Sequence, residues 1–112
     1  LTRIAMLKPD VIVAEAGASP MEPYNGATAC DRLKPLVTLS ILCASDPYAV
    51  LGVQNAFQLR PDIVAGPAAN TTAAVELVKK LTGVRALNLR DAGAAEELRM
   101  LLDRKIVAPL QT

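Results

Sequence analysis

Short apolar blocks alternate with longer amphipathic blocks along this chain. Four apolar blocks are rich in Val, Ile and Leu and are bounded by Pro, Asp, Gly or Ser, a pattern typical of buried parallel strands. They predict strands at residues 11–14, 36–43, 63–65 and 84–89. A weaker block at residues 106–110 predicts a further short strand.

Helices are predicted between these strands from their capping signals. Ser45-Asp46-Pro47 offers a capping oxygen followed by proline at the first helical position, and residues 70–72 offer further capping groups. Gly83 stands where a helix C-cap belongs. The predicted helices are residues 27–33, 47–58, 73–81 and 94–103, and residues 2–7 resemble the end of another helix.

Alternating strands and helices predict an α/β fold with a mainly parallel sheet and helices on both faces. The composition agrees, because 52% of the residues are hydrophobic and only 3% are aromatic, so the core must consist of small aliphatic side chains. With 112 residues the chain fits a single α/β domain or the C-terminal half of a larger one.

One heptapeptide occurs twice in similar form. Leu-Lys-Pro-Asp-Val-Ile-Val at residues 7–13 resembles Leu-Arg-Pro-Asp-Ile-Val-Ala at residues 59–65. Because proline stops a helix and aspartate favours a turn, two helix-to-strand junctions can converge on this pattern, and we favour that interpretation over a duplicated functional unit.

Charge, hydrophobic pattern and cysteine content exclude several classes of function. The net charge is +1 without a basic run, so we expect no nucleic-acid partner. The apolar run at residues 35–44 is too short for a membrane span, and neither a signal peptide nor a disulfide framework is visible, so we expect a cytoplasmic protein. Cys30 and Cys43 are interpreted as buried thiols, and the absence of histidine removes the usual general base.

The predicted topology places candidate functional residues along the carboxyl-terminal edge of the sheet. In open parallel sheets ligands bind beyond the carboxyl ends of the strands, so the polar residues after each strand should meet on one rim. Three of these positions also have a structural interpretation, because Asp46, Asn70 and Thr71 can act as helix caps with or without a ligand. The candidate residues are Glu15, Gly17, Ser19, Tyr24, Asn25 and Gly26 after the first strand, Asp46 after the second, Asn70 and Thr71 after the third, and Arg90 after the fourth.

Glu15 is a candidate catalytic and metal-binding residue. A carboxylate placed directly after four apolar strand residues is costly unless it meets water, a cation or hydrogen-bond donors. In nucleotide-hydrolysing folds an acidic residue at such a strand end orients magnesium or the attacking water. The Gly-Lys-Ser or Gly-Lys-Thr phosphate loop that would accompany it does not occur in these residues.

Three segments, residues 15–28, 42–47 and 66–71, resemble the C-terminal P-loop-like domain of a bacterial and archaeal family of unknown function. Some of its members are D-glutamate N-acetyltransferases, and the scaffold is related to dethiobiotin synthetase. This chain differs from the family pattern in having Ala18 where glycine is usual and in lacking histidine. The resemblance implies a three-layer P-loop-like fold and marks Glu15, Gly17, Ser19, Tyr24, Gly26, Asp46, Asn70 and Thr71 as site residues.

The leading hypothesis is a fragment of a P-loop-like enzyme, either an N-acyltransferase or a nucleotide-dependent ligase. Its ligand would be a nucleotide with magnesium or acetyl-coenzyme A, bound beside a small carboxylate substrate. Glu15 and Asp46 would be catalytic, and Arg90 would clamp an anionic group. The alternative is a non-catalytic binding or oligomerisation module, because an exposed strand edge tends to pair. The expected partners are thus a small ligand and either a second copy or the remainder of a longer chain.

Overall fold

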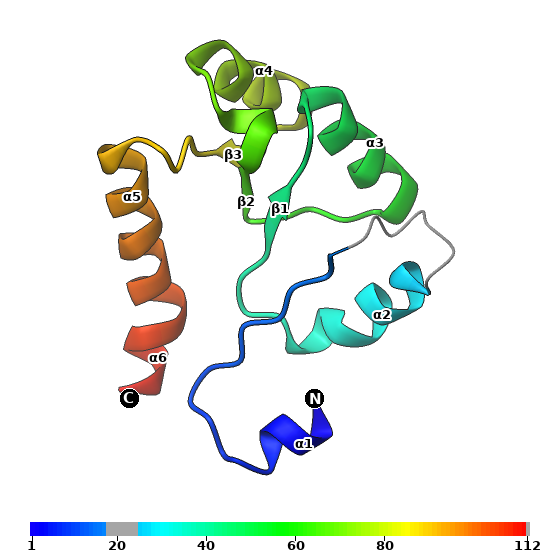
Figure 1. Ribbon diagram of the computed structural model, residues 1–112, viewed down its shortest axis with the longest axis vertical. Helices are drawn as coiled ribbons and strands as arrows, with labels where there is room; N and C mark the ends of the chain where they lie inside the picture. The colour runs from blue at the N-terminus through cyan, green and yellow to red at the C-terminus, as the bar shows by residue number, and fades with distance from the viewer. Residues whose placement is uncertain (18–24, 112) are drawn as a thin grey trace.

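The computed structural model describes residues 1–17 and 25–111 and contains a three-stranded parallel sheet (Figure 1). Its strands are β1 (Ile41–Cys43), β2 (Ile63–Ala65) and β3 (Arg85–Ala86), and they lie in chain order β1-β2-β3. Ile63 of β2 pairs with Ile41 on one side and with Arg85 on the other. The α/β class and the parallel sheet predicted from the sequence are therefore confirmed, while the three-layer P-loop assignment stays a prediction.

The helices α3 (Pro47–Phe57) and α4 (Thr72–Thr82) connect successive strands and pack against one face of the sheet. Val64 of β2 is fully buried there between Val50 of α3 and Val78 of α4. These small side chains allow the helices to approach the sheet and each other closely, which accounts for an aliphatic core without aromatic residues. A 3₁₀ turn, η2 (Gly66–Ala69), leads from β2 into α4.

The helix α5 (Ala92–Leu102) packs on the opposite side of β2. Ile63 points away from the α3 and α4 core and is buried with Leu87 and Leu101. Beyond α5 the chain continues through a π-helical stretch, η3 (Asp103–Val107), into α6 (Ala108–Leu110). Figure 1 shows these last three elements as one column beside the sheet. Helices thus cover both faces of the central strand.

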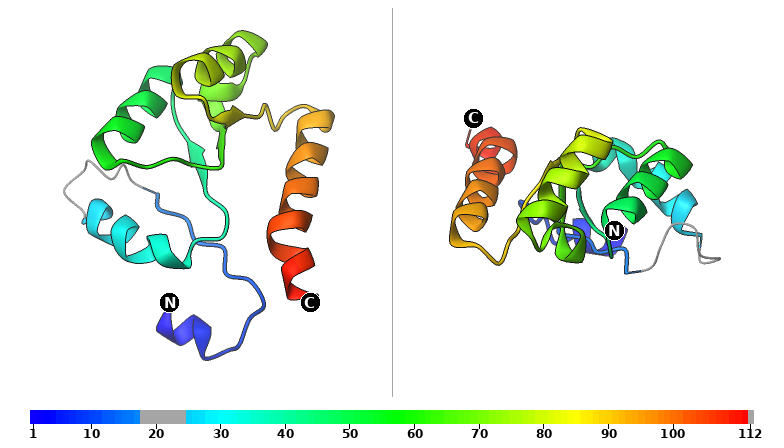
Figure 2. Two further views of the ribbon diagram at one scale, coloured as in Figure 1. Left: turned by 180° about the vertical axis from the view of Figure 1, so that it is seen from behind. Right: turned by 90° about the horizontal axis from the view of Figure 1, so that it is seen from above.

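The N-terminal third of the chain packs less closely. It contains α1 (Thr2–Ala5), α2 (Gly26–Leu33) and the 3₁₀ turn η1 (Lys34–Leu36), none of which has a fully buried residue. The left view in Figure 2 shows α1 at the opposite end of the molecule from α4. The core is therefore built by residues 39–101.

Two predicted strands are wrong. Residues 11–14 are extended but pair with no strand among the described residues, and Val13 is 94% exposed. Their β-branched side chains favour a strand, but a strand also needs a neighbour to receive its backbone hydrogen bonds. Residues 106–110 continue the helical column instead, since so short an apolar block does not distinguish strand from helix.

The remaining elements differ mainly in their bounds. Residues 36–40, predicted as strand, form the end of η1 and a loop, and β3 keeps only Arg85 and Ala86 of the predicted residues 84–89. The predicted helices match α2, α3, α4 and α5 within about two residues, the usual uncertainty of helix ends. Among the described residues, no helix has the length and apolar character needed to cross a membrane.

Candidate functional site

The carboxyl edge of the sheet brings together the chain segments that leave β1 and β2. The Ala68 amide donates to the Ala44 carbonyl at 2.9 Å, which ties the two segments to each other. Gly66 adopts φ +74°, and a Cβ built on it would lie 3.4 Å from Cys43 Cβ. Glycine is needed here because the turn out of β2 combines a left-handed backbone with close contact to β1.

At the start of α3, Asp46 acts as the N-cap. Its Oδ1 accepts a hydrogen bond from the Ala49 amide at 2.9 Å, and its Oδ2 accepts one from Ser45 Oγ at 3.0 Å. These bonds, from the Ala49 amide first and then from Ser45, lower the pKa of Asp46 below its ordinary value. A carboxylate thus already occupies the amide end of α3, so this helix is a poor site for an external anion.

At the start of α4, a neutral residue performs the same task. Thr71 Oγ1 accepts from the Ala74 amide at 3.1 Å, and the Thr71 carbonyl accepts from the Val75 amide at 3.0 Å. The amides of Thr72 and Ala73 have no hydrogen-bond partner in the part of the chain that the structure describes. The positive end of the α4 dipole is therefore not neutralised by a carboxylate cap.

Asn88 links the end of β3 to the loop before α4. Its Nδ2 donates to the Asn70 carbonyl at 3.3 Å, and its Oδ1 accepts from the Arg90 amide at 3.2 Å. Through these two bonds the backbone of Arg90 is held next to the segment that starts α4. The Arg90 side chain is exposed and forms no ion pair with the described residues. The bridging role of Asn88 depends on contacts between segments that are distant in sequence, so local sequence gives no signal for it.

The structure thus brings Asp46, Asn70, Thr71 and Arg90 to the same edge of the sheet. Glu15 and Gly17 lie in the extended N-terminal segment, which does not join the sheet. Asn25 has a left-handed backbone with φ 60° and is the N-cap position of α2, and Gly26 is the first residue of that helix. Ser19 and Tyr24 lie outside the described residues.

Magnesium binding by Glu15 stays a prediction. Within residues 1–17 and 25–111, no group of three or more His, Cys, Asp or Glu side chains lies close enough to hold a metal ion. Asp46 is held by its capping bond from the Ala49 amide and by the bond from the Ser45 hydroxyl. Among the described residues, Glu15 thus belongs to no such cluster of metal-binding side chains.

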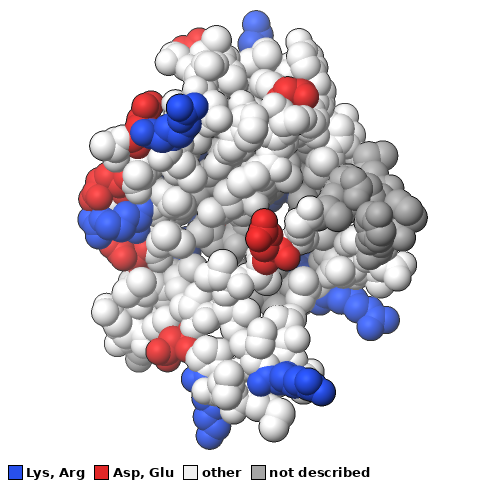
Figure 3. Space-filling model, in the orientation of Figure 1, with Lys and Arg blue, Asp and Glu red and all other residues white. Residues whose placement is uncertain are grey.

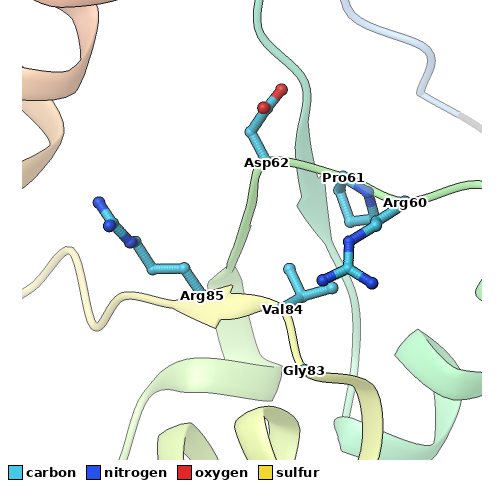
Figure 4. Close-up of a pocket in the computed structure, with 6 residues that line it drawn as sticks. All are labelled: Arg60, Pro61, Asp62, Gly83, Val84 and Arg85. Atoms are coloured by element: carbon cyan, nitrogen blue, oxygen red, sulfur yellow. The ribbon is translucent and has the colours of Figure 1, made fainter.

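A cleft of about 240 Å³ lies at the opposite, amino-terminal edge of the sheet (Figure 4). Figure 4 shows the Arg60 guanidinium directed towards Val84 and Gly83, at the C-terminal end of α4, whereas Arg85 points away. Arg85 pairs with Glu97 at 3.4 Å. Since a cation at a helix C-terminus is stabilising by itself, Arg60 has a structural role there. The two cations do not converge, so we place the candidate site at the carboxyl edge. The cleft is lined by Arg60, Pro61, Asp62, Gly83, Val84 and Arg85.

Several charged side chains on and near α5 form ion pairs. Figure 3 shows acidic and basic groups together at the side of the molecule formed by α5, and an acidic group surrounded by uncharged side chains near the centre of the view. Arg99 of α5 contacts both Glu96 and Asp103. These exposed pairs are ordinary helix-surface contacts and suggest no ligand.

Comparison with known proteins found no family model, no curated protein and no solved structure that matches this chain.

Proposed function

We propose that this chain binds the anionic group of a small ligand at the N-terminus of α4. The observation that carries the proposal is the hydrogen-bond chain from the Arg90 amide to Asn88 Oδ1 and from Asn88 Nδ2 to the Asn70 carbonyl. It holds a cationic residue beside a helix start that has two unused amides. Backbone amides, a helix dipole and an arginine are a common combination for phosphate and carboxylate.

The ligand class that fits this arrangement is a phosphorylated cofactor. A nucleotide with magnesium or acetyl-coenzyme A would place a phosphate on the Thr72 and Ala73 amides, within reach of the Arg90 side chain. We propose that the chain is part of a P-loop-like enzyme that uses such a cofactor on a small carboxylate substrate. Glu15 would act as a base or hold the metal ion, and Asp46 would keep α3 in place at the edge of the site.

Binding is the first property to test. The protein is titrated separately with MgATP, acetyl-coenzyme A and inorganic phosphate, and the amide resonances of Thr72 and Ala73 are followed by NMR. We expect one of the two cofactors to shift both resonances. The Arg90→Ala variant should bind about 10-fold more weakly, because a charge-assisted hydrogen bond contributes about 1.5–3 kcal/mol.

Arg32→Ala is the matched control, because Arg32 is exposed on α2 and forms no ion pair with the described residues. It should leave the affinity unchanged. Equal weakening by both variants would indicate general charge attraction. Unchanged Thr72 and Ala73 resonances at millimolar cofactor would show that the N-terminus of α4 does not bind the ligand.

If the chain is part of an enzyme, Glu15→Gln in the intact enzyme should abolish turnover without changing the fold.

A second candidate function is assembly, and the exposure of β1 favours it. Ile41 is 43% exposed although it belongs to β1, and Val37, in the segment that leads into β1, is 50% exposed. In the described residues β1 pairs only with β2, so one of its edges is unpaired. Light scattering at increasing protein concentration should show a dimer if this edge joins two copies, and a monomer at every concentration otherwise.

A further inference from the structure

The extended residues 11–14 have no partner strand in the described part of the chain, and one edge of β1 has none either. Val11 and Ile12 are 43% and 41% exposed and Val13 is 94% exposed, which is unusual for three consecutive β-branched residues. On β1, Ile41 and Cys43 are exposed and the outer backbone edge has no partner strand among the described residues. The same chain therefore contains an exposed β-branched segment and a free strand edge that such a segment could pair with.

The structure also gives the repeated heptapeptide a physical meaning. Before β2, helix α3 ends, Gln58 adopts a left-handed backbone with φ 52°, and Pro61-Asp62 leads into the strand. Before residues 11–14, helix α1 ends, Lys8 adopts φ 53°, and Pro9-Asp10 follows. In both junctions a left-handed residue and a Pro-Asp pair follow the helix, although Lys8 lies inside its heptapeptide and Gln58 lies one residue before the other. The junction after α3 delivers the fully buried strand β2.

The connection between residues 14 and 41 is suitable for joining two neighbouring parallel strands. It contains the helix α2, just as α3 connects β1 to β2 and α4 connects β2 to β3. Parallel strands need a crossover of a dozen or more residues, usually with one helix, and residues 15–40 exceed that length. Each of the other strand-helix-strand units in this fold joins adjacent strands.

We propose that residues 11–14 add to the free edge of β1 as a fourth parallel strand. In the register that β1 and β2 use, Val11 pairs with Ile41, Ile12 with Leu42 and Val13 with Cys43. Alternation along the strand then places Val11 and Val13 beside the exposed Ile41 and Cys43, and Ile12 beside Leu42 on the α3 side. The described form is the open state of this element, and strand addition is the closed state.

Closure has a consequence for the candidate site. A parallel strand at residues 11–14 ends at the carboxyl edge of the sheet, so Glu15 moves to the same edge as Asp46. This consequence rests on the proposed function, whereas strand addition itself does not. The segment would then regulate the site by delivering or withdrawing the Glu15 carboxylate.

The native thiol of Cys43 provides the test. In a Cys30→Ser background, Val13→Cys is exposed to oxidised glutathione, and the products are identified by intact mass and by peptide mapping without reduction. Neighbouring residues on paired strands lie within the Cα separation that a disulfide spans. We expect an intramolecular bond between residues 13 and 43, formed at least about fivefold faster than in the matched Ile12→Cys variant, whose side chain faces the other side.

Other products would overturn the proposal. A covalent dimer would show that the β1 edge takes a second copy, and equal rates for the two variants would show an unpaired, freely moving segment. Amide hydrogen exchange of residues 11–14 in the unmodified protein is an independent readout that needs no variant. Exchange at the rate of an unstructured peptide would contradict strand addition, and slowed exchange would support it.

The disulfide-locked protein separates this proposal from the proposed function. If the bond forms and neither MgATP nor acetyl-coenzyme A binds before or after locking, strand addition stands and the proposed function fails. If a cofactor binds to the open protein but the disulfide does not form, the proposed function stands and strand addition fails. If the disulfide forms and a cofactor also binds, locking should change the affinity for MgATP by several-fold, and Glu15→Gln should remove that change.

Discussion

Lys105 Nζ lies 2.5 Å from Asp62 Oδ1, so an ion pair joins the π-helical stretch after α5 to the residue that precedes β2. The other oxygen of Asp62 accepts from the Ser40 amide at 2.8 Å and from Ser40 Oγ at 3.1 Å. One carboxylate therefore holds three segments together: the start of β1, the start of β2 and the C-terminal helical column. This arrangement explains how η3 and α6 stay attached although neither has a buried residue.

Asp62→Asn should destabilise the protein by about 1 kcal/mol. Hydrogen bonds to charged groups contribute about 1.5–3 kcal/mol, and we reduce this value because both side chains are partly exposed. Chemical denaturation measures the change. The control is Asp31→Asn on α2, because the Asp31 side chain forms no hydrogen bond or ion pair with the described residues, and this variant should leave stability unchanged. Equal stability of both variants would show that the Asp62 contacts contribute nothing.

The stability supplied by Asp62 should depend on pH. Burial raises the pKa of Asp62, but the hydrogen bonds from Lys105 and Ser40 outweigh it, so the pKa lies below the ordinary value of 3.8. Because the folded pKa is lowered, the contribution is fully present above that value and is lost as the pH falls through the folded pKa. The difference between wild type and Asp62→Asn should thus be constant from pH 7 to 5 and shrink below about pH 3.8. A difference that persists unchanged to pH 2 would contradict this.

Two glycine substitutions should act in opposite directions. Gly66→Ala forces a Cβ into a left-handed turn beside Cys43 and should cost about 1 kcal/mol or more. Gly52→Ala lies within α3 with nothing near its Cβ position and should stabilise the protein by about 0.5–1 kcal/mol. Thermal unfolding of both variants checks the prediction. A loss of stability in both would mean that α3 is not helical at Gly52.

Thr71→Ala should remove the N-cap of α4 and lower stability by about 1 kcal/mol, whereas Thr71→Ser should keep most of it. For a domain of this size the alanine variant should unfold roughly 4 °C lower. Circular dichroism during heating provides the measurement. Identical melting of the two variants would remove the capping role of Thr71. Neither variant alters Arg90, so the affinity for a bound anion can be compared in both.

Local signals explain which parts of the fold could be predicted from sequence. The start of α3 was predictable because Asp46 and Pro47 act within one helical turn, and Gly83 marked the end of α4 in the same way. The strand predicted at residues 11–14 is unpaired in the described form, because strand formation depends on a neighbour that local sequence does not specify. The pairing of Lys105 with Asp62, 43 residues apart, had no local signal at all.

The candidate site was predictable to a similar extent. The rule on carboxyl ends of parallel strands grouped Asp46, Thr71 and Arg90 on one edge, because each lies in the segment that leaves a strand that forms. It placed Glu15 there only through the strand at residues 11–14. The sequence offered candidate caps for both helices. Only the side-chain contacts of the structure show that α3 starts with a carboxylate cap while α4 starts with a neutral cap.

The order of the sheet also bears on how the chain folds. Because β1, β2 and β3 are adjacent in both space and sequence, each pairing closes a loop of only one helix and its turns. Such short-range closure has a low entropic cost and favours fast folding. Residues 41–86 would then form a cooperative unit that appears early in refolding, and the N-terminal segment and the C-terminal column would join it afterwards. Synthesis from the N-terminus would expose residues 1–40 first, before the sheet on which they depend has been made.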